Sequence, residues 1–189
     1  MNVVLIQSSV RKDRLGPSIV EKVKPFLVRR KWNLDIIDPA EHRLPLLYER
    51  YFEVKSPSEE FRQLHSILEK ADGFILVTAE YNHSIPPALK NFLDHFLKEY
   101  AFKASGIISY SDGAYGGVRA AEHLRLVCTN LKMPPITAQP AITFAAKRQS
   151  PAQQKEFEKV MNVFTDQLEW YMEALKARRK KGLPGEQKK

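Results

Sequence analysis

The chain has 189 residues, a formal net charge of +8 at pH 7, 43% hydrophobic residues and one cysteine. This length suits one well-filled core and is too short for two ordinary domains. The absence of any run of about 18 apolar residues excludes a membrane-spanning helix. A lone cysteine excludes an internal disulfide, so we expect a protein of the reducing cytoplasm.

Most of the positive charge lies near the C-terminus. Residues 176–189 hold seven Lys/Arg and one Glu, whereas residues 1–175 hold 23 basic and 21 acidic residues. We therefore expect one domain over residues 1–176 and a basic, disordered tail over residues 177–189. Charge runs of this kind are usually solvated, so no nucleic-acid partner is expected.

Strand-like and helix-like segments alternate along the chain. Strands are predicted for residues 3–6, 32–37, 73–78, about 104–110 and within 136–144. Helices are predicted from Pro17, Pro57 and about 87, over about 121–131, and from Pro151. This alternation predicts a flavodoxin-like three-layer αβα sandwich with a five-stranded parallel sheet of order 2-1-3-4-5.

Local signals set the expected helix ends. Ser56-Pro57-Ser58-Glu59 and Ser150-Pro151-Ala152-Gln153 both match a capping box with proline at the first helical position. Pro25 lies inside the first helical pattern and predicts a kink or an early end there.

Several kinds of chemistry lack their motifs. The sequence contains no G-x-x-x-x-G-K-[ST], no G-x-G-x-x-G and no G-x-S-x-G. The five histidines are dispersed, so no metal site is predicted. Cys128 lies on an apolar helical stripe, where we expect a buried side chain rather than a nucleophile. Catalysis is therefore expected to come from a bound cofactor, without a catalytic side chain.

Three polar loops follow the first, third and fourth predicted strands, which are neighbours in the predicted sheet. These loops should therefore meet at one edge of the sheet. Residues 7–18 combine hydroxyls, arginines and a helix start, which suits a phosphate monoester or forms a solvated turn. Residues 79–91 suit a flat heteroaromatic ring, or form an ordinary turn capped by Ser84. Residues 109–119 contain Gly116-Gly117, which lets the backbone approach a ligand or simply makes a turn.

These loops carry a resemblance to the NADPH-dependent FMN reductase family of flavodoxin-like quinone, azo and chromate reductases. It covers about residues 2–145, and the matching residues are Ser9-Val10-Arg11 with Arg14-Leu15-Gly16, Glu80-Tyr81-Asn82-His83-Ser84-Ile85-Pro86 with Ala88-Leu89-Lys90-Asn91, and Gly116-Gly117-Val118-Arg119-Ala120. The family usually has Gly where this chain has Ser8, and Pro where it has Ala79. Ser8 is expected to crowd the phosphate turn or to add a hydroxyl donor, and Ala79 to loosen its loop.

The resemblance implies an oxidoreductase that transfers hydride from NADPH or NADH, through bound FMN, to quinones or other small oxidants. The residues implied around the FMN phosphate are Ser9, Arg11, Leu15, Gly16 and Ser18. Those implied along the isoalloxazine ring are Glu80, Tyr81 and Asn82, with Ser111, Gly113, Gly116 and Gly117 at its pyrimidine edge.

Other partners and functions follow from charge and apolar content. Arg11, Arg14 and Arg119 offer positive charge for the phosphates of the nicotinamide cofactor. Residues 44–52 are too apolar for a free loop and should pack on a second subunit or cover the flavin. The resemblance implies a homodimer or homotetramer. The alternative function is a non-enzymatic flavodoxin-like electron carrier, but such carriers are strongly acidic; a regulatory scaffold that uses the basic tail ranks lower still.

Overall fold

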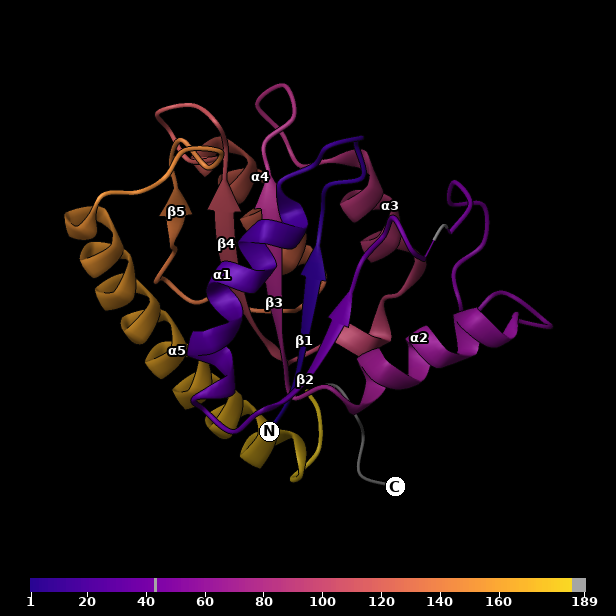
Figure 1. Cartoon of the computed structure of the whole chain (residues 1–189). Helices are drawn as coiled ribbons and strands as arrows, with labels where there is room; N and C mark the ends of the chain where they lie inside the picture. Colours follow the sequence, from indigo (N-terminus) through magenta and orange to yellow (C-terminus); the bar gives the residue numbers. More distant parts are fainter. Residues whose placement is uncertain (43, 185–189) are drawn as a thin grey trace.

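One parallel sheet organises the computed structural model, which describes residues 1–42 and 44–184. Its strands are β1 (Asn2–Gln7), β2 (Asn33–Ile37), β3 (Gly73–Ala79), β4 (Ala104–Tyr110) and β5 (Ala141–Ile142). The strand order is β2-β1-β3-β4-β5 and every pair is parallel, as predicted. All loops that leave the carboxyl ends of the strands therefore lie at one edge of the sheet (Figure 1).

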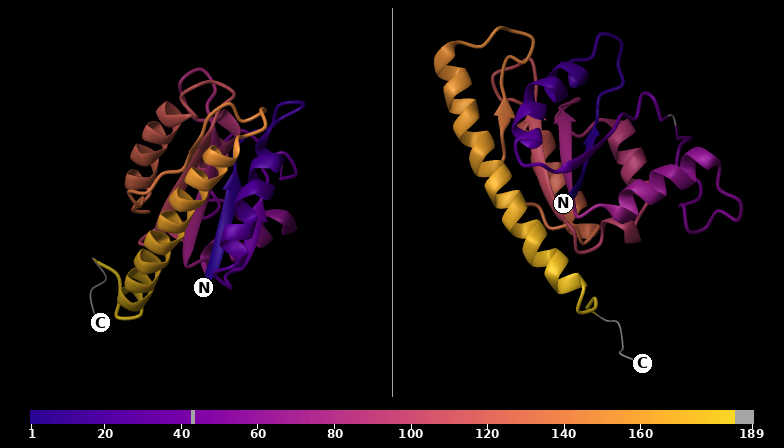
Figure 2. Two further views of the ribbon diagram at one scale, coloured as in Figure 1. Left: turned by 60° about the vertical axis from the view of Figure 1, so that its left-hand side comes forward. Right: turned by 60° about the horizontal axis from the view of Figure 1, so that its bottom comes forward.

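Helices cover both faces of the sheet. They are α1 (Gly16–Val28), α2 (Glu59–Lys70), α3 (Pro87–His95), α4 (Val118–Asn130) and α5 (Pro151–Arg179), with a short 3-10 helix η1 (Lys98–Tyr100). Helices α1 and α5 pack on one face, whereas α2, α3 and α4 pack on the other (Figure 1, Figure 2). This is the expected three-layer sandwich. Within the described chain, no helix is both long and apolar enough to cross a membrane.

The two capping boxes predicted from sequence have different outcomes. At α5, the Ser150 hydroxyl accepts from the backbone N–H of Gln153, and the Gln153 side chain accepts from the N–H of Ser150, which confirms that box. At α2, the prediction was wrong by two residues, because Ser58 rather than Ser56 is the N-cap and accepts from Phe61 N–H. Starting at Glu59 places two glutamates in the first turn, where the helix dipole favours negative charge.

Two expected helix ends also differ from the structure. Helix α1 continues through Pro25 to Val28, because Pro25 is exposed and lies in the last turn, where one lost hydrogen bond is tolerated. Residues 177–179, expected to begin the tail, belong to α5. Residues 185–189 of that expected tail lie outside the described residues.

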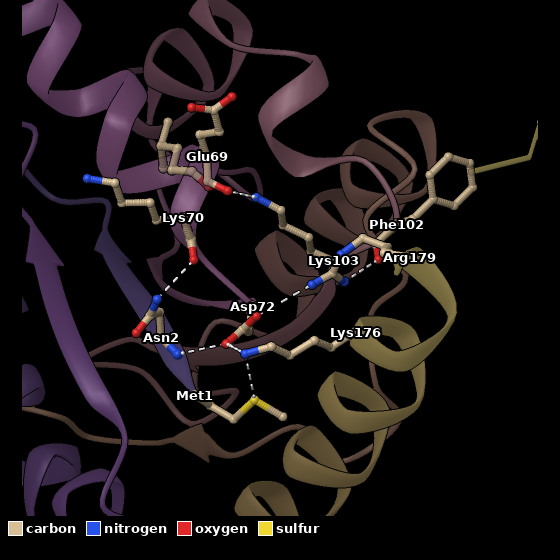
Figure 3. A network of polar contacts seen from close by, with 10 residues as sticks. Met1, Asn2, Glu69, Lys70, Asp72, Phe102, Lys103, Lys176 and Arg179 are labelled. Carbon is tan, nitrogen blue, oxygen red and sulfur yellow. Dashed lines mark hydrogen bonds and ion pairs between the residues drawn. The ribbon is translucent and has the colours of Figure 1, made fainter. Parts of the chain in front are cut away.

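The end of α5 is held by a buried carboxylate at the amino edge of the sheet (Figure 3). Asp72, only 5% exposed, accepts from Asn2 N–H at 2.9 Å and from Lys176 Nζ at 2.7 Å, and Arg179 lies 3.6 Å away. Burial alone would raise the pKa of Asp72, but the hydrogen bonds from Lys176 and Asn2 lower it. Arg179 also donates to the carbonyl of Phe102 at 2.7 Å. This network explains why the helix extends into the basic segment.

Cys128 lies in α4 and is fully buried. Burial raises the pKa of its thiol to about 12. The thiol therefore stays protonated at neutral pH, which confirms the prediction of a buried, unreactive side chain.

Candidate functional site

A cavity of about 380 Å³ opens at the carboxyl edge of the sheet, between the loops that follow β1, β3 and β4. Open parallel sheets bind their ligands in this position. The residues that line it are Ser9, Arg11, Lys12, Asp13, Arg14, Leu15, Ala79, Glu80, Tyr81, Tyr110, Ser111 and Asp112.

Half of the residues named from sequence line this cavity. They are Ser9, Arg11, Leu15, Glu80, Tyr81 and Ser111. The others do not line it: Gly16 and Ser18 lie in the first turn of α1, and Asn82, Gly113, Gly116 and Gly117 lie in the loops after β3 and β4. The lining residues outside that set are Lys12, Asp13, Tyr110 and Asp112, with Arg14, which was expected to meet the nicotinamide cofactor, and Ala79, which was named as a departure from the family. All of these are neighbours of named residues, so extending each motif along its loop would have found them.

The loop after β1 lines the cavity and contains unpaired backbone donors. Within the described chain, the backbone N–H groups of residues 11–13 make no hydrogen bond. Helix α1 starts directly after this loop without a side-chain cap, and the Ser18 hydroxyl donates to the carbonyl of Leu15. Asp13 has a φ of 55°, a left-handed conformation. Free N–H groups beside a helix N-terminus form an anion-binding site.

Arg14 holds this loop rather than supplying free charge. Its guanidinium contacts both carboxylate oxygens of Asp38 at 2.5 Å and donates to the carbonyl of Ser9 at 2.7 Å. The hydrogen bond to Asp38 raises the pKa of Arg14. Gln7 donates its side-chain amide to the same carboxylate at 2.6 Å. Asp38 thus neutralises one of the three positive charges expected to meet the nicotinamide cofactor.

The side chain of Ser9 is held by Tyr110, the last residue of β4. The Tyr110 hydroxyl donates to Ser9 Oγ at 2.8 Å, and burial raises the pKa of Tyr110, so the phenol remains a proton donor. A Cβ atom at Gly16 would lie 2.4 Å from Ser9 Oγ. Gly16 therefore leaves the space that the Ser9 hydroxyl occupies.

The loop after β3 contains a two-residue hairpin. Tyr81 and Ser84 exchange backbone hydrogen bonds of 2.9 and 3.0 Å around Asn82 and His83, whose φ values are 50° and 65°. Positive φ at both central residues is the signature of a type I′ turn. Helix α3 starts after Pro86, so Ser84 is not its N-cap, contrary to the alternative of an ordinary turn capped by Ser84. The turn places Asn82 at the hairpin tip, whereas Tyr81 lines the cavity.

Glu80 brings an unsatisfied acceptor to the cavity wall. Its Oε1 lies 3.4 Å from Arg119 Nη1, and the Arg119 guanidinium carbon lies 4.4 Å from the ring centre of Tyr115. Among the residues that the structure describes, Glu80 Oε2 is buried and has no partner. A buried acceptor of this kind calls for a donor, and a ligand in the cavity can supply one. The charge of Arg119 is also partly committed, within the protein, to Glu80.

The glycines of the loop after β4 have a packing role. Gly116 and Gly117 have φ values of 59° and 77°. A Cβ at Gly117 would lie 2.7 Å from the carbonyl oxygen of Tyr110, and one at Gly116 would lie 3.1 Å from the backbone of Ala141. These glycines let the loop pack closely on β4 and β5, and the close approach they make is to the protein backbone.

Ser8 and Ala79 contact each other. The N–H of Ala79 donates to Ser8 Oγ at 2.8 Å, and both residues are buried. The Ser8 hydroxyl accepts from the end of β3, and its expected effect on the phosphate turn stays a prediction. The looser loop expected from Ala79 is countered by the same bond.

The apolar segment of residues 44–52 lies beside the site. Leu46 and Tyr48 are 86% and 93% exposed, and Leu46 lines a separate cavity of about 350 Å³ with Val10 and Pro87. None of residues 44–52 lines the cavity between the three loops. Within one chain, this segment does not cover that cavity.

The strand order and the cavity at the carboxyl edge define a flavodoxin-like fold. The chain belongs to the family described as NADPH-dependent FMN reductase, whose profile matches residues 1–147. It is accordingly an oxidoreductase, of a family named for its use of FMN and NADPH.

Relatives and solved structures agree with this membership. An NAD(P)H-dependent FMN reductase of Schizosaccharomyces pombe is 33% identical over 147 residues, which cover 75% of this chain and 72% of that protein. A quinone reductase of Pseudomonas putida is 28% identical over 138 residues, or 70% and 72% of the two chains. The flavoenzyme FerB, an NAD(P)H:(acceptor) oxidoreductase from Paracoccus denitrificans, has a TM-score of 0.74 at 20% identity, with 90% and 98% covered. The similarity to FerB supports the fold alone.

Proposed function

We propose that this chain is an FMN-dependent NAD(P)H oxidoreductase that transfers hydride, through FMN bound in the cavity, to quinones or other small oxidants. The observation that carries the proposal is the union of an anion site and an aromatic, polar-edged wall at the carboxyl edge of the sheet. Relatives that are named quinone reductases support the choice of acceptor.

The residues present fit FMN at both ends. The free N–H groups of residues 11–13 and the guanidinium of Arg11 would hold the phosphate. Tyr81 and the buried Oε2 of Glu80 would meet the ring and one of its N–H donors. The cavity volume falls within the range of about 300–1,000 Å³ typical of small-molecule sites.

FMN, when bound, would supply the redox chemistry, which is the transfer of hydride between NAD(P)H and a quinone, with solvent as the source of the proton that completes the hydroquinone. The side chains of this chain bind and orient. Ser9, held by Tyr110, fixes the wall of the phosphate loop, and Arg119 holds the Glu80 carboxylate in place. No side chain needs to act as an acid or a base.

Residues 44–52 would pack on a second copy of the chain, giving a homodimer or homotetramer in the cytoplasm. The support is the exposure of Leu46 and Tyr48 next to an apolar cavity. Light scattering at micromolar concentration tests this part of the proposal. A monomeric mass would refute the oligomer and leave the enzymatic proposal to its own test.

The test of function compares FMN with riboflavin, which lacks the phosphate. Wild-type protein should bind FMN with the visible absorption of a bound flavin and should oxidise NADPH when a quinone is added. Arg11→Gln should weaken FMN by about tenfold, the loss of one charge-assisted contact, and leave riboflavin affinity unchanged. Arg178→Gln is the matched control, an exposed arginine at the far end of α5.

Equal losses of affinity for FMN and riboflavin in Arg11→Gln would contradict the proposed phosphate site. A protein that binds FMN but needs a second protein to oxidise NADPH would be an electron carrier instead.

A further inference from the structure

A single side-chain hydrogen bond joins the first two loops of the cavity. Ser8 directly follows β1, and Ala79 is the last residue of β3. The β1–β3 ladder ends with the pair Gln7 and Val77, and the bond from Ala79 N–H to Ser8 Oγ lies just beyond it. Ser8 is fully buried and Ala79 is 6% exposed, so water does not replace this bond.

This bond lies between the two ends of the cavity. Ser9, the neighbour of Ser8, belongs to the wall on the side of the anion site. Glu80 and Tyr81 follow Ala79 and form the wall on the side of the ring. The Ser8–Ala79 bond therefore ties the two walls together just beyond the end of the β1–β3 ladder, where a ligand with a phosphate and a flat ring must fit between them.

The chemistry of the bond makes the two residues depend on each other. Glycine at position 8 would remove the acceptor and leave the buried N–H of Ala79 unpaired, which is costly. Proline at position 79 has no N–H, and its Cδ would take the place of that hydrogen, against a Ser8 Oγ that lies 2.8 Å from the nitrogen. Glycine and proline together would need no bond and would not collide.

We propose that Ser8 and Ala79 are a coupled pair of positioning residues, which align the phosphate wall of the cavity with its ring wall. This inference rests on the proposed function, because FMN is the ligand that spans the two walls. Neither side chain touches the reacting atoms; both act through the loops that they connect.

Four proteins test the coupling: wild type, Ser8→Gly, Ala79→Pro and the double variant. FMN affinity is measured by fluorescence titration, and the stability of the FMN-free protein by urea unfolding. We expect Ser8→Gly to weaken FMN by about tenfold and Ala79→Pro by more. The double variant should return to within about threefold of wild type, so that proline improves the Ser8→Gly protein. The comparison of the double variant with Ser8→Gly tests the coupling even when Ala79→Pro alone does not fold.

The matched control is Ser105→Gly, a fully buried serine at the opposite end of the sheet that donates to the carbonyl of Met133 at 3.1 Å. It should lower stability and leave FMN affinity unchanged. Additive losses in the Ser8 and Ala79 series would overturn the coupling. Coupling in unfolding without coupling in FMN affinity would overturn the positioning role. Failure of the wild type to bind FMN refutes the proposed function, a result distinct from both.

Discussion

Replacing Gly16 with alanine would place one methyl group under the phosphate wall of the cavity. The added Cβ would lie 2.4 Å from Ser9 Oγ, 2.5 Å from Gln7 Oε1 and 3.2 Å from Tyr110 Oη. All three side chains are at least 96% buried. The atoms in the way are therefore polar groups that hold one another, and the smallest relief is to push the Ser9 hydroxyl away from Tyr110.

The size of the effect follows from two opposing contributions. Overpacking a well-packed site costs about 1–3 kcal/mol. Replacing a glycine without backbone strain returns about 0.5–1 kcal/mol, because the unfolded chain has fewer conformations to lose. Gly16→Ala should thus lower the free energy of unfolding by about 1–2 kcal/mol, and the displaced Ser9 should weaken FMN binding by about tenfold.

Urea unfolding of the FMN-free protein and a fluorescence titration with FMN measure the two effects of Gly16→Ala. Gly113→Ala is the control in another loop of the same site, because its Cβ would meet only Ser111 Oγ, at 3.7 Å. That control should raise the free energy of unfolding by about 0.5–1 kcal/mol, because its Cβ meets no strain. It should leave FMN affinity within error of wild type, because Gly113 does not line the cavity. A Gly16→Ala protein with unchanged FMN affinity would refute the view that Ser9 forms part of the phosphate wall.

Three further predictions concern ion pairs and buried charges. Asp38→Ala should destabilise the protein by about 3 kcal/mol in urea unfolding, because it leaves the Arg14 guanidinium without its carboxylate partner. Adding Arg14→Met to that variant should recover part of the lost stability. Burial lowers the pKa of Lys103 from 10.5 to about 8, so the unfolded chain binds more protons than the folded chain between these pH values, and stability should rise with pH there. Lys103→Met should abolish this rise in stability. An unchanged dependence of stability on pH in Lys103→Met would contradict the lowered pKa of Lys103. The lowered pKa of Asp72 contributes stability above the ordinary carboxyl pKa of 3.8, which is lost as pH falls through the folded value. Lys176→Met should therefore be less stable than wild type at neutral pH and converge with it in strong acid, as acid unfolding followed by circular dichroism would show.

The sequence predicted the fold because its signals are local. The apolar runs of the strands and the capping box at Ser150 each specify an element within a few residues, and the parallel-sheet rules then limit the strand order. The predicted start of α2 was wrong because Ser56 and Ser58 both precede residues that suit the first turn of a helix, and only the packing of the helix selects between the two serines.

The site was predicted less completely, because its contacts join residues far apart in the sequence. Arg14 meets Asp38 from the next strand, and Ser8 meets Ala79 across 71 positions. No periodicity or motif reports such pairs. The family resemblance placed Gly117 near a ligand, and only the position of the Tyr110 backbone shows which close approach it makes possible.

The buried thiol of Cys128 has a consequence if quinones are the acceptors, as proposed above. Quinones are electrophiles that arylate exposed thiolates, and this chain holds its only sulfhydryl protonated inside the layer between α4 and the sheet. The protein therefore offers its proposed acceptors no soft nucleophile of this kind, and repeated turnover should leave it free of covalent adducts at sulfur.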